Sequence, residues 1–178
     1  MTQSFQLVNE RLEAVYKGLG EMQTLANGVG DLKKVLSNVK TRGILGEIQL
    51  GMILEEILSP EQYETNIATV PNSKNVVEYA IKLPGDERSV YLPIDSKFPA
   101  DAYQALQEAY ETGDAGIVQN NADILIQRIK SFAKDIKTKY IEPPYTTDFA
   151  IMFLPFEGLY AEAVNRGLVE ILQRDYHV

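Results

Sequence analysis

A short motif at residues 93–97, with the sequence PIDSK, carries the side chains best suited to chemistry, and an acidic residue, Glu78, lies upstream. Because side chains alternate between the two faces of a strand, Asp95 and Lys97 should project to one side and Ile94 to the other. Carboxylate oxygens are the ligands that hard divalent cations prefer. A bound cation and a nearby ammonium both offset the charge that develops when a phosphate is attacked. The motif is therefore typical of metal-dependent phosphodiester cleavage.

The composition limits the kinds of active site that the chain can build. Its 178 residues include no cysteine and a single histidine, His177. Thiolate metal sites, disulfides, a cysteine nucleophile and a histidine-based triad are therefore excluded, so catalysis has to rest on Asp, Glu, Lys or Tyr. The sequence also has no run of about 18 apolar residues, the length that a transmembrane helix needs.

Residues 4–40 carry apolar side chains spaced alternately three and four apart, which is the pattern of a coiled coil. The positions are Phe5, Val8, Leu12, Val15, Leu19, Met22, Ala26 and Val29. Glycines within this stretch each cost about 1 kcal/mol relative to alanine in a helix interior, so the helix should need a partner helix. We expect a homo-oligomer held by this segment; the alternative is a helix that packs on its own domain.

Residues 41–178 alternate between helical and strand patterns. A glycine-containing helix is predicted at 41–58, and strands at 66–70, 76–83, 89–95 and 149–154. Helices at 101–112 and 121–140 separate the last two strands, and helices at 157–165 and from 168 onward follow. The segment 149–154 is almost continuously apolar, as in a buried strand. We expect a mixed α/β (α+β) domain with a sheet of about four strands flanked by helices and preceded by the long N-terminal helix.

The net charge of −8 argues against a protein that coats nucleic acid without specificity. Basic residues nevertheless cluster in two stretches, which either contact phosphates or form solvated helix faces. The first stretch contains Lys33, Lys34, Lys40 and Arg42, and the second contains Arg128, Lys130, Lys134, Lys137 and Lys139.

Four motifs make the chain resemble the RmuC family of DNA recombination proteins over about residues 40–178. They occur in the family's order: RGxxGExxL at 42–50, KLPG at 82–85, IDSK at 94–97 and LPxExLYA at 154–161. In the last motif, Glu157 is expected to cap a helix and Tyr160 to lie in the core. We divide the chain into a coiled-coil helix at 1–40 and a nuclease-like domain at 41–178, which we expect to continue beyond residue 178.

The resemblance implies a PD-(D/E)xK fold, which is restriction-endonuclease-like, and a Mg²⁺- or Mn²⁺-dependent deoxyribonuclease activity. In that scheme Asp95 and Lys97 fill the D-x-K positions. Glu78 fills the position of the first acid, although Val77 precedes it where proline is usual and its side chain is one methylene longer than the usual Asp. Glu47 matches a helix glutamate that often completes such sites. Metal ligands are therefore expected at Glu47, Glu78 and Asp95, and catalytic roles at Lys97 and Glu47.

Each of these residues also has a purely structural interpretation. Asp95 is suited to cap the turn after its strand, and Lys97 to be a solvated lysine. Glu78 is suited to face solvent on an edge strand, and Glu47 to lie on a helix surface.

Two functional classes follow from these observations. The first is a DNA recombination protein that hydrolyses DNA phosphodiester bonds in the cytoplasm. The second is a non-catalytic coiled-coil scaffold built on a degenerate nuclease fold. Convergence of the four side chains favours the first class, and a Glu78 that points away from Asp95 favours the second. We expect DNA as the partner, and a membrane anchor only in flanking sequence.

Overall fold

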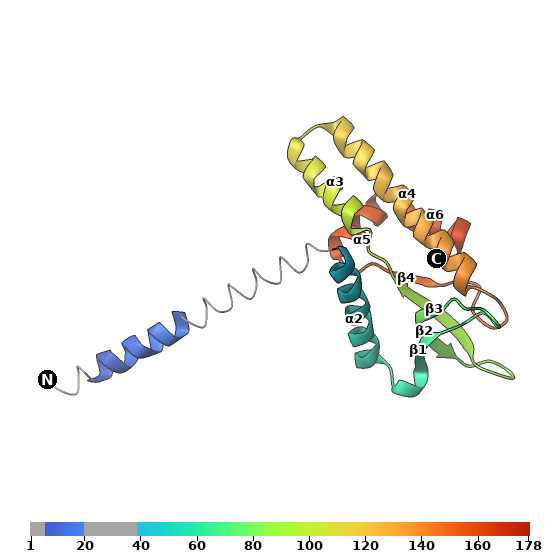
Figure 1. Ribbon diagram of the computed structural model, residues 1–178, viewed down its shortest axis with the longest axis horizontal. Coiled ribbons are helices and arrows are strands. Elements are labelled where there is room, and N and C mark those ends of the chain that lie inside the picture. Colours follow the sequence, from blue (N-terminus) through green and yellow to red (C-terminus); the bar gives the residue numbers. More distant parts are fainter. Residues whose placement is uncertain (1–5, 20–38) are drawn as a thin grey trace. The chain divides into compact units, whose positions relative to one another are not determined.

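The computed structural model describes residues 6–19 and 39–178, with side chains described at 6–19 and from residue 45 onward. The chain divides into two compact units, Met1–Thr41 and Arg42–Val178, and each is described by itself (Figure 1). Within these described residues, no helix combines the length and the apolar character needed to cross a membrane.

Residues 6–19 of the first unit form a helix. Its four heptad side chains are all between 51% and 58% exposed: Val8, Leu12, Val15 and Leu19. The predicted heptad positions Phe5, Met22, Ala26 and Val29 lie outside the described residues, as do Lys33 and Lys34 of the first basic stretch. The described part of the predicted coiled coil therefore presents an uncovered apolar seam.

The second unit alternates helices and strands in the predicted order. Its elements are α2 (Val39–Ile57), a short 3₁₀ helix η1 (Pro60–Gln62), β1 (Tyr63–Ile67), β2 (Val77–Leu83), β3 (Val90–Ser96), α3 (Ala100–Thr112), α4 (Ala115–Tyr140), β4 (Ile151–Phe153), α5 (Glu157–Asn165) and α6 (Leu168–Tyr176). The sheet has the order β1-β2-β3-β4, with antiparallel pairs up to β3 and with β4 parallel to β3. This arrangement confirms the predicted mixed sheet of four strands flanked by helices.

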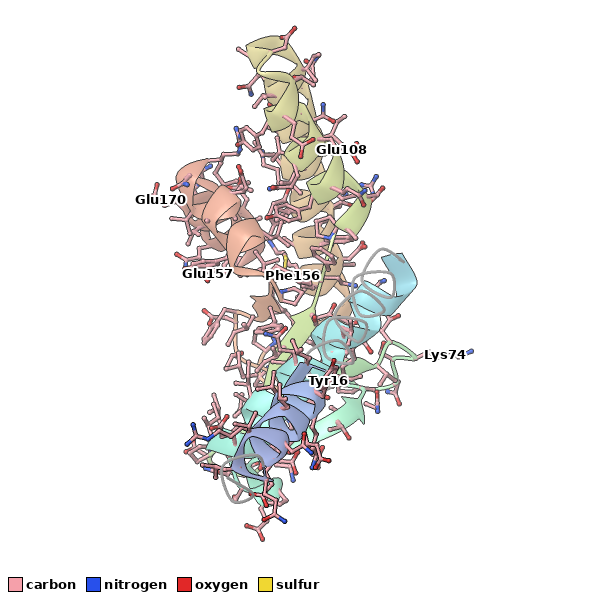
Figure 2. All side chains as sticks on the ribbon, turned by 90° about the vertical axis from the view of Figure 1, so that its left-hand side faces the viewer. Tyr16, Lys74, Glu108, Phe156, Glu157 and Glu170 are labelled. Carbon is pink, nitrogen blue, oxygen red and sulfur yellow. The ribbon has the colours of Figure 1, made fainter. Side chains whose placement is uncertain are left out.

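The parallel pairing of β4 explains why two helices stand between the last two strands. Parallel neighbours need a long crossover connection, and α3 and α4 supply it as a pair of long helices side by side (Figure 1). The core on this side is built from buried residues of all four later helices, including Leu106, Leu125, Ile129, Leu159 and Leu168. Glu157 and Glu170 lie on the outer surface of α5 and α6, whereas Phe156 lies where these helices meet the rest of the domain (Figure 2).

The two faces of the sheet are covered by different helices. Leu50 and Leu54 of α2, which are one turn apart, pack against Ile94 on one face. On the other face Met152 of β4 packs against the core that contains α4. The Thr69 hydroxyl donates a hydrogen bond to the Tyr140 carbonyl at 2.8 Å, which holds the end of α4 to the segment after β1.

Several predicted boundaries and buried positions are wrong. The last strand is Ile151–Phe153 rather than 149–154, and Ile151 is 40% exposed rather than buried. The first strand lies at Tyr63–Ile67 rather than 66–70. Its pairing with β2 begins at Tyr63, which lies opposite Ile81. The helix predicted from 121 begins at Ala115, because the Asp114 side chain accepts hydrogen bonds from two backbone N–H groups of its first turn. Tyr160, predicted in the core, is 56% exposed, and the N-cap position of α5 is occupied by Phe156 rather than by Glu157.

Glycines let α2 lie close to the sheet end. A Cβ at Gly46 would lie 2.8 Å from Ser96 Oγ and 3.0 Å from Pro155 Cγ, and one at Gly51 would meet the Tyr79 hydroxyl. The absence of a side chain at these two positions therefore permits a close backbone approach. The residue next to Gly46 is Glu47, so this approach brings a candidate site residue to the sheet.

We predict that Gly46→Ala destabilises the domain by about 1–3 kcal/mol, because the added methyl group overpacks a site closed by the rigid Pro155 ring. In an uncrowded helix the same change would stabilise by up to about 1 kcal/mol. Urea denaturation of both proteins measures the difference. Gly18→Ala is the control, because nothing lies within 4 Å of its added Cβ. An unchanged or raised urea midpoint for Gly46→Ala would contradict the prediction.

Candidate functional site

The register between β2 and β3 places the two candidate carboxylates opposite each other. Tyr79 is paired with Ile94 in this antiparallel ladder, so the next pair in the same register is Glu78 and Asp95. Directly opposite residues of an antiparallel pair have their side chains on the same face. Glu78 and Asp95 therefore share one face of the sheet, while Tyr79 and Ile94 face the core under α2.

Lys97 joins Asp95 on that face, as the alternation of the strand predicts. Lys97 Nζ lies 3.2 Å from Asp95 Oδ2 and 5.5 Å from the centre of the Phe132 ring of α4. The Lys97 backbone N–H donates to the Phe153 carbonyl at 3.0 Å, which ties the end of β3 to β4. The Lys97 side chain remains 30% exposed, so its ammonium can meet a ligand from solvent.

Glu47 reaches the same site from α2. The Tyr79 hydroxyl donates to the Glu47 backbone carbonyl at 3.4 Å, which fixes this turn of the helix beside β2. The Glu47 carboxyl is near enough to Glu78 to raise the pKa of that group, and its charge also raises the pKa of Asp95. The structure thus brings all four predicted site residues together.

Burial makes the two strand carboxylates unusual. Asp95 is only 4% exposed. Burial raises the pKa of Asp95, and the neighbouring Lys97 partly opposes this rise. Burial, together with the Glu47 and Asp95 carboxylates, raises the pKa of Glu78 to about 8. Both groups are therefore held in surroundings that disfavour their ionised forms.

One oxygen of each carboxylate lacks a hydrogen bond. Among the described side chains, Glu78 Oε2 and Asp95 Oδ2 are buried without a hydrogen-bond partner. Asp95 Oδ2 is near Lys97 Nζ, but the two atoms do not have the direction of a hydrogen bond. Buried acceptors without partners are costly, and a cation bound between them would remove that cost. The donor set of these two residues therefore fits a hard divalent cation.

The carboxylates do not form a closed set of metal ligands by themselves. In the part of the chain that the structure describes, no group of three or more Asp, Glu, His or Cys side chains is arranged to hold a metal ion. Metal ligation by Glu47, Glu78 and Asp95 therefore stays a prediction.

The end of α4 contributes two side chains that the sequence did not assign to the site. The positive charge of Lys139 acts on Asp95 and lowers its pKa. Burial raises the pKa of Tyr140, and the charges of Asp95 and Glu78 raise it further. Phe132, Lys139 and Tyr140 are seven and eight residues apart, so they share one face of the helix. Helical spacing from Phe132 is therefore the sequence signal that would have identified Lys139 and Tyr140.

The second basic stretch divides between structural and site-facing roles. Arg128 pairs with Asp101 of α3 at 3.3 Å, and Lys137 donates to the Asp175 carbonyl at 3.1 Å. Lys139 is the member whose charge reaches Asp95. Of the structural alternatives, an edge position for Glu78 is wrong, because β2 lies between β1 and β3.

Comparison with known proteins agrees with the motifs. The sequence pattern of the RmuC family matches residues 1–178. A protein of Xylella fastidiosa (strain Temecula1) named DNA recombination protein RmuC homolog is 52% identical over 179 aligned residues, which cover 98% of this chain and 39% of the relative. A protein of the same name from Chlamydia trachomatis is 32% identical over 149 residues, which cover 80% of this chain and 31% of the relative. No solved structure matches the chain.

The chain thus spans about two fifths or less of the length of these relatives.

We predict that Glu78 makes the folded protein less stable as the pH rises, when divalent cations are absent. Its pKa is about 8 in the folded state and about 4.3 when unfolded, so the folded state binds the proton more tightly. The corresponding stabilisation is complete below about pH 4 and is lost as the pH rises towards 8. Urea midpoints at pH 5, 7 and 9 in EDTA measure this slope.

Glu78→Gln should flatten that slope and be more stable than the wild type at pH 9. Glu64→Gln is the control of opposite sign, because hydrogen bonding with Lys82 lowers the pKa of Glu64. The Glu64 variant should lose stability at neutral pH. Identical pH profiles for the wild type and Glu78→Gln would contradict the prediction.

Proposed function

Because this chain belongs to the RmuC family and its curated relatives are named DNA recombination proteins, we propose that it acts in DNA recombination by metal-dependent hydrolysis of DNA phosphodiester bonds. We propose that it acts on this DNA in the cytoplasm. The observation that carries the proposal is a pair of carboxylates on adjacent strands, the half-buried Glu78 and the buried Asp95, each with a buried oxygen that has no hydrogen-bond partner. The Lys97 ammonium lies beside Asp95.

The proposed cofactor is Mg²⁺ or Mn²⁺, held by Glu78 and Asp95, with Glu47 as the third carboxylate. When bound, the cation would supply Lewis-acid stabilisation of charge on the phosphate and would acidify a water molecule. An apolar core under β3 holds these carboxylates in place, since Ile94 packs in one buried cluster with Leu50 and Leu54. Rigid support of this kind is what a catalytic constellation needs.

Lys97 supplies positive charge from the protein itself. Its ammonium lies beside Asp95 and against the Phe132 ring, so its position is fixed while its side chain remains partly exposed. In this place Lys97 can neutralise charge on a phosphate and orient the attacking water. Glu47 is suited to accept a proton from that water, because its carboxyl lies next to Glu78 at the same end of the sheet.

The second candidate function is a non-catalytic scaffold built on the same fold. Two observations favour it: the described residues hold no ready set of three metal-ligating side chains, and Val77 stands where proline usually precedes the first acid. The net charge of −8 also weakens attraction to DNA. The scaffold hypothesis does not explain why two neighbouring carboxylates each have a buried oxygen without a hydrogen-bond partner.

We predict that the protein cleaves single-stranded, duplex or branched DNA in the presence of Mg²⁺ or Mn²⁺, and that EDTA abolishes cleavage. Asp95→Asn and Lys97→Met should each lower the rate by about 100-fold or more, the loss typical of removing one charge-stabilising group. Gel assays with labelled DNA measure the rate, and calorimetry with Mn²⁺ measures metal binding.

Lys134→Met is the matched control, because residue 134 is two positions from Phe132 and therefore lies on the opposite side of α4. It should retain cleavage. A folded protein that neither binds Mn²⁺ nor cuts any of the three substrates would support the scaffold instead. Cleavage that survives Asp95→Asn would place the reaction elsewhere.

We propose that the partner of the N-terminal helix is a second copy of the chain. The exposed seam of Val8, Leu12, Val15 and Leu19 has the spacing of a coiled coil, which buries such residues between two helices. Leu12→Glu should therefore shift the protein towards the monomer, as measured by light scattering after size exclusion. Glu13→Gln, one residue off the seam, is the control. An unchanged mass for Leu12→Glu would exclude this seam as the interface.

A further inference from the structure

The outer edge of β4 and the apolar pocket beside it have no role in the proposed function. The pocket has a volume of about 500 Å³ and lies where β4 meets α5 and α6. Most of its wall is apolar and includes Met152, Leu154, Ala163, Val169 and Leu172. Its size and apolar character are those of a cavity built to enclose side chains or a ligand.

The sequence of β4 is typical of a central strand, but β4 lies at the edge of the sheet. Residues 149–154 read FAIMFL, with no charge and no proline, and such runs are typical of strands buried on both faces. Yet β4 ends the sheet, and Phe149 and Ile151 are 45% and 40% exposed. Natural edge strands are protected by short length, charges, proline or bulges, and of these β4 has the short length, with three residues. β4 has no protecting charge or proline, so its sequence is that of a covered strand.

Neighbouring residues of α5 extend the same exposed apolar surface. Tyr160 lines the pocket, and Tyr160 and Val164 are 56% and 44% exposed. The two expectations of burial that the structure overturns, for the 149–154 strand and for Tyr160, therefore meet at one place. A further segment packed against this surface would bury both the 149–154 strand and Tyr160, as the sequence predicts.

The backbone of β4 is able to accept that neighbour. Because the Phe153 carbonyl accepts from the Lys97 N–H, Phe153 directs its backbone groups to β3, and those of Met152 point to the outer edge. At the start of this edge the Ala150 N–H already donates to the His177 carbonyl at 2.9 Å. Extended backbone can therefore pair along the outer edge of β4.

We propose that a further β-strand pairs with the outer edge of β4 and sends alternate side chains into the pocket. The strand is supplied by the same polypeptide, from the part of the full-length protein that corresponds to the remaining length of its relatives. The chain spans 39% of the Xylella relative, which therefore has ample sequence to supply it. An apolar edge without charge or proline favours a permanent cover, and a tethered segment provides one at a high effective concentration.

Photo-crosslinking in the full-length protein tests this proposal. Phe149→p-benzoylphenylalanine places the probe at the start of the edge, and Ile124→p-benzoylphenylalanine, at an exposed site on α4, is the control. Equal amounts of ¹⁵N-labelled and unlabelled protein are mixed before irradiation, and crosslinked peptides are identified by mass spectrometry. The expected result is a crosslink from residue 149 to one contiguous segment outside residues 1–178, without mixed isotopes and absent from the control.

Hydrogen exchange on the unmodified protein gives an independent measurement. The Met152 amide should exchange at least about tenfold more slowly in the full-length protein than in the 178-residue chain, because strand pairing protects it. Crosslinks with mixed isotopes would overturn the proposal in favour of a second copy. Crosslinks confined to residues 1–178, or equal exchange in both proteins, would overturn it in favour of a free edge. None of these outcomes depends on DNA cleavage.

Discussion

Tyr79 faces Ile94 across the β2–β3 pair, and a slip of one residue would exchange the core face of the sheet for the candidate site. In the observed register, Ile94 packs with Leu50 and Leu54 of α2, and the acids take the other face. The apolar contacts under α2 therefore determine that Glu78 and Asp95 lie opposite each other. Hydrophobic packing therefore sets the geometry of the site. No contact between the two acids is needed to place them opposite each other.

The two acids oppose the folding that brings them together. Burial raises the pKa of both carboxyls, and the Lys97 ammonium offsets only part of this effect for Asp95. Replacing such a buried polar pair by apolar residues often leaves stability unchanged or raises it. The presence of Glu78 and Asp95 with buried oxygens that have no hydrogen-bond partner is therefore easier to explain by a function that uses their charge than by a structural role. This argument favours a catalytic or metal-binding site over a scaffold.

The sequence predicted what depends on local periodicity. Alternation along the strands gave the faces of Glu78, Asp95 and Lys97, and helical spacing gave α2, α3 and the later helices. It did not give the contribution of Lys139 and Tyr140, because their proximity to Asp95 depends on how α4 crosses the sheet. It also missed the start of α4, where a single Asp114 side chain stabilises the first turn. The position of α4 on the sheet depends on tertiary packing, whereas the Asp114 cap is a local sequence signal that was overlooked.

The edge strand β4 is paired directly with β3, the strand that carries Asp95. Asp95 pairs with Met152 of β4, and Met152 lines the apolar pocket. The Lys97 N–H is held by the Phe153 carbonyl of the same strand. A strand that covers the outer edge of β4 would therefore restrain the backbone one strand away from Asp95 and Lys97. Because a misplacement of about 1 Å can weaken a catalytic constellation, completing the sheet at β4 and ordering the site are expected to occur together.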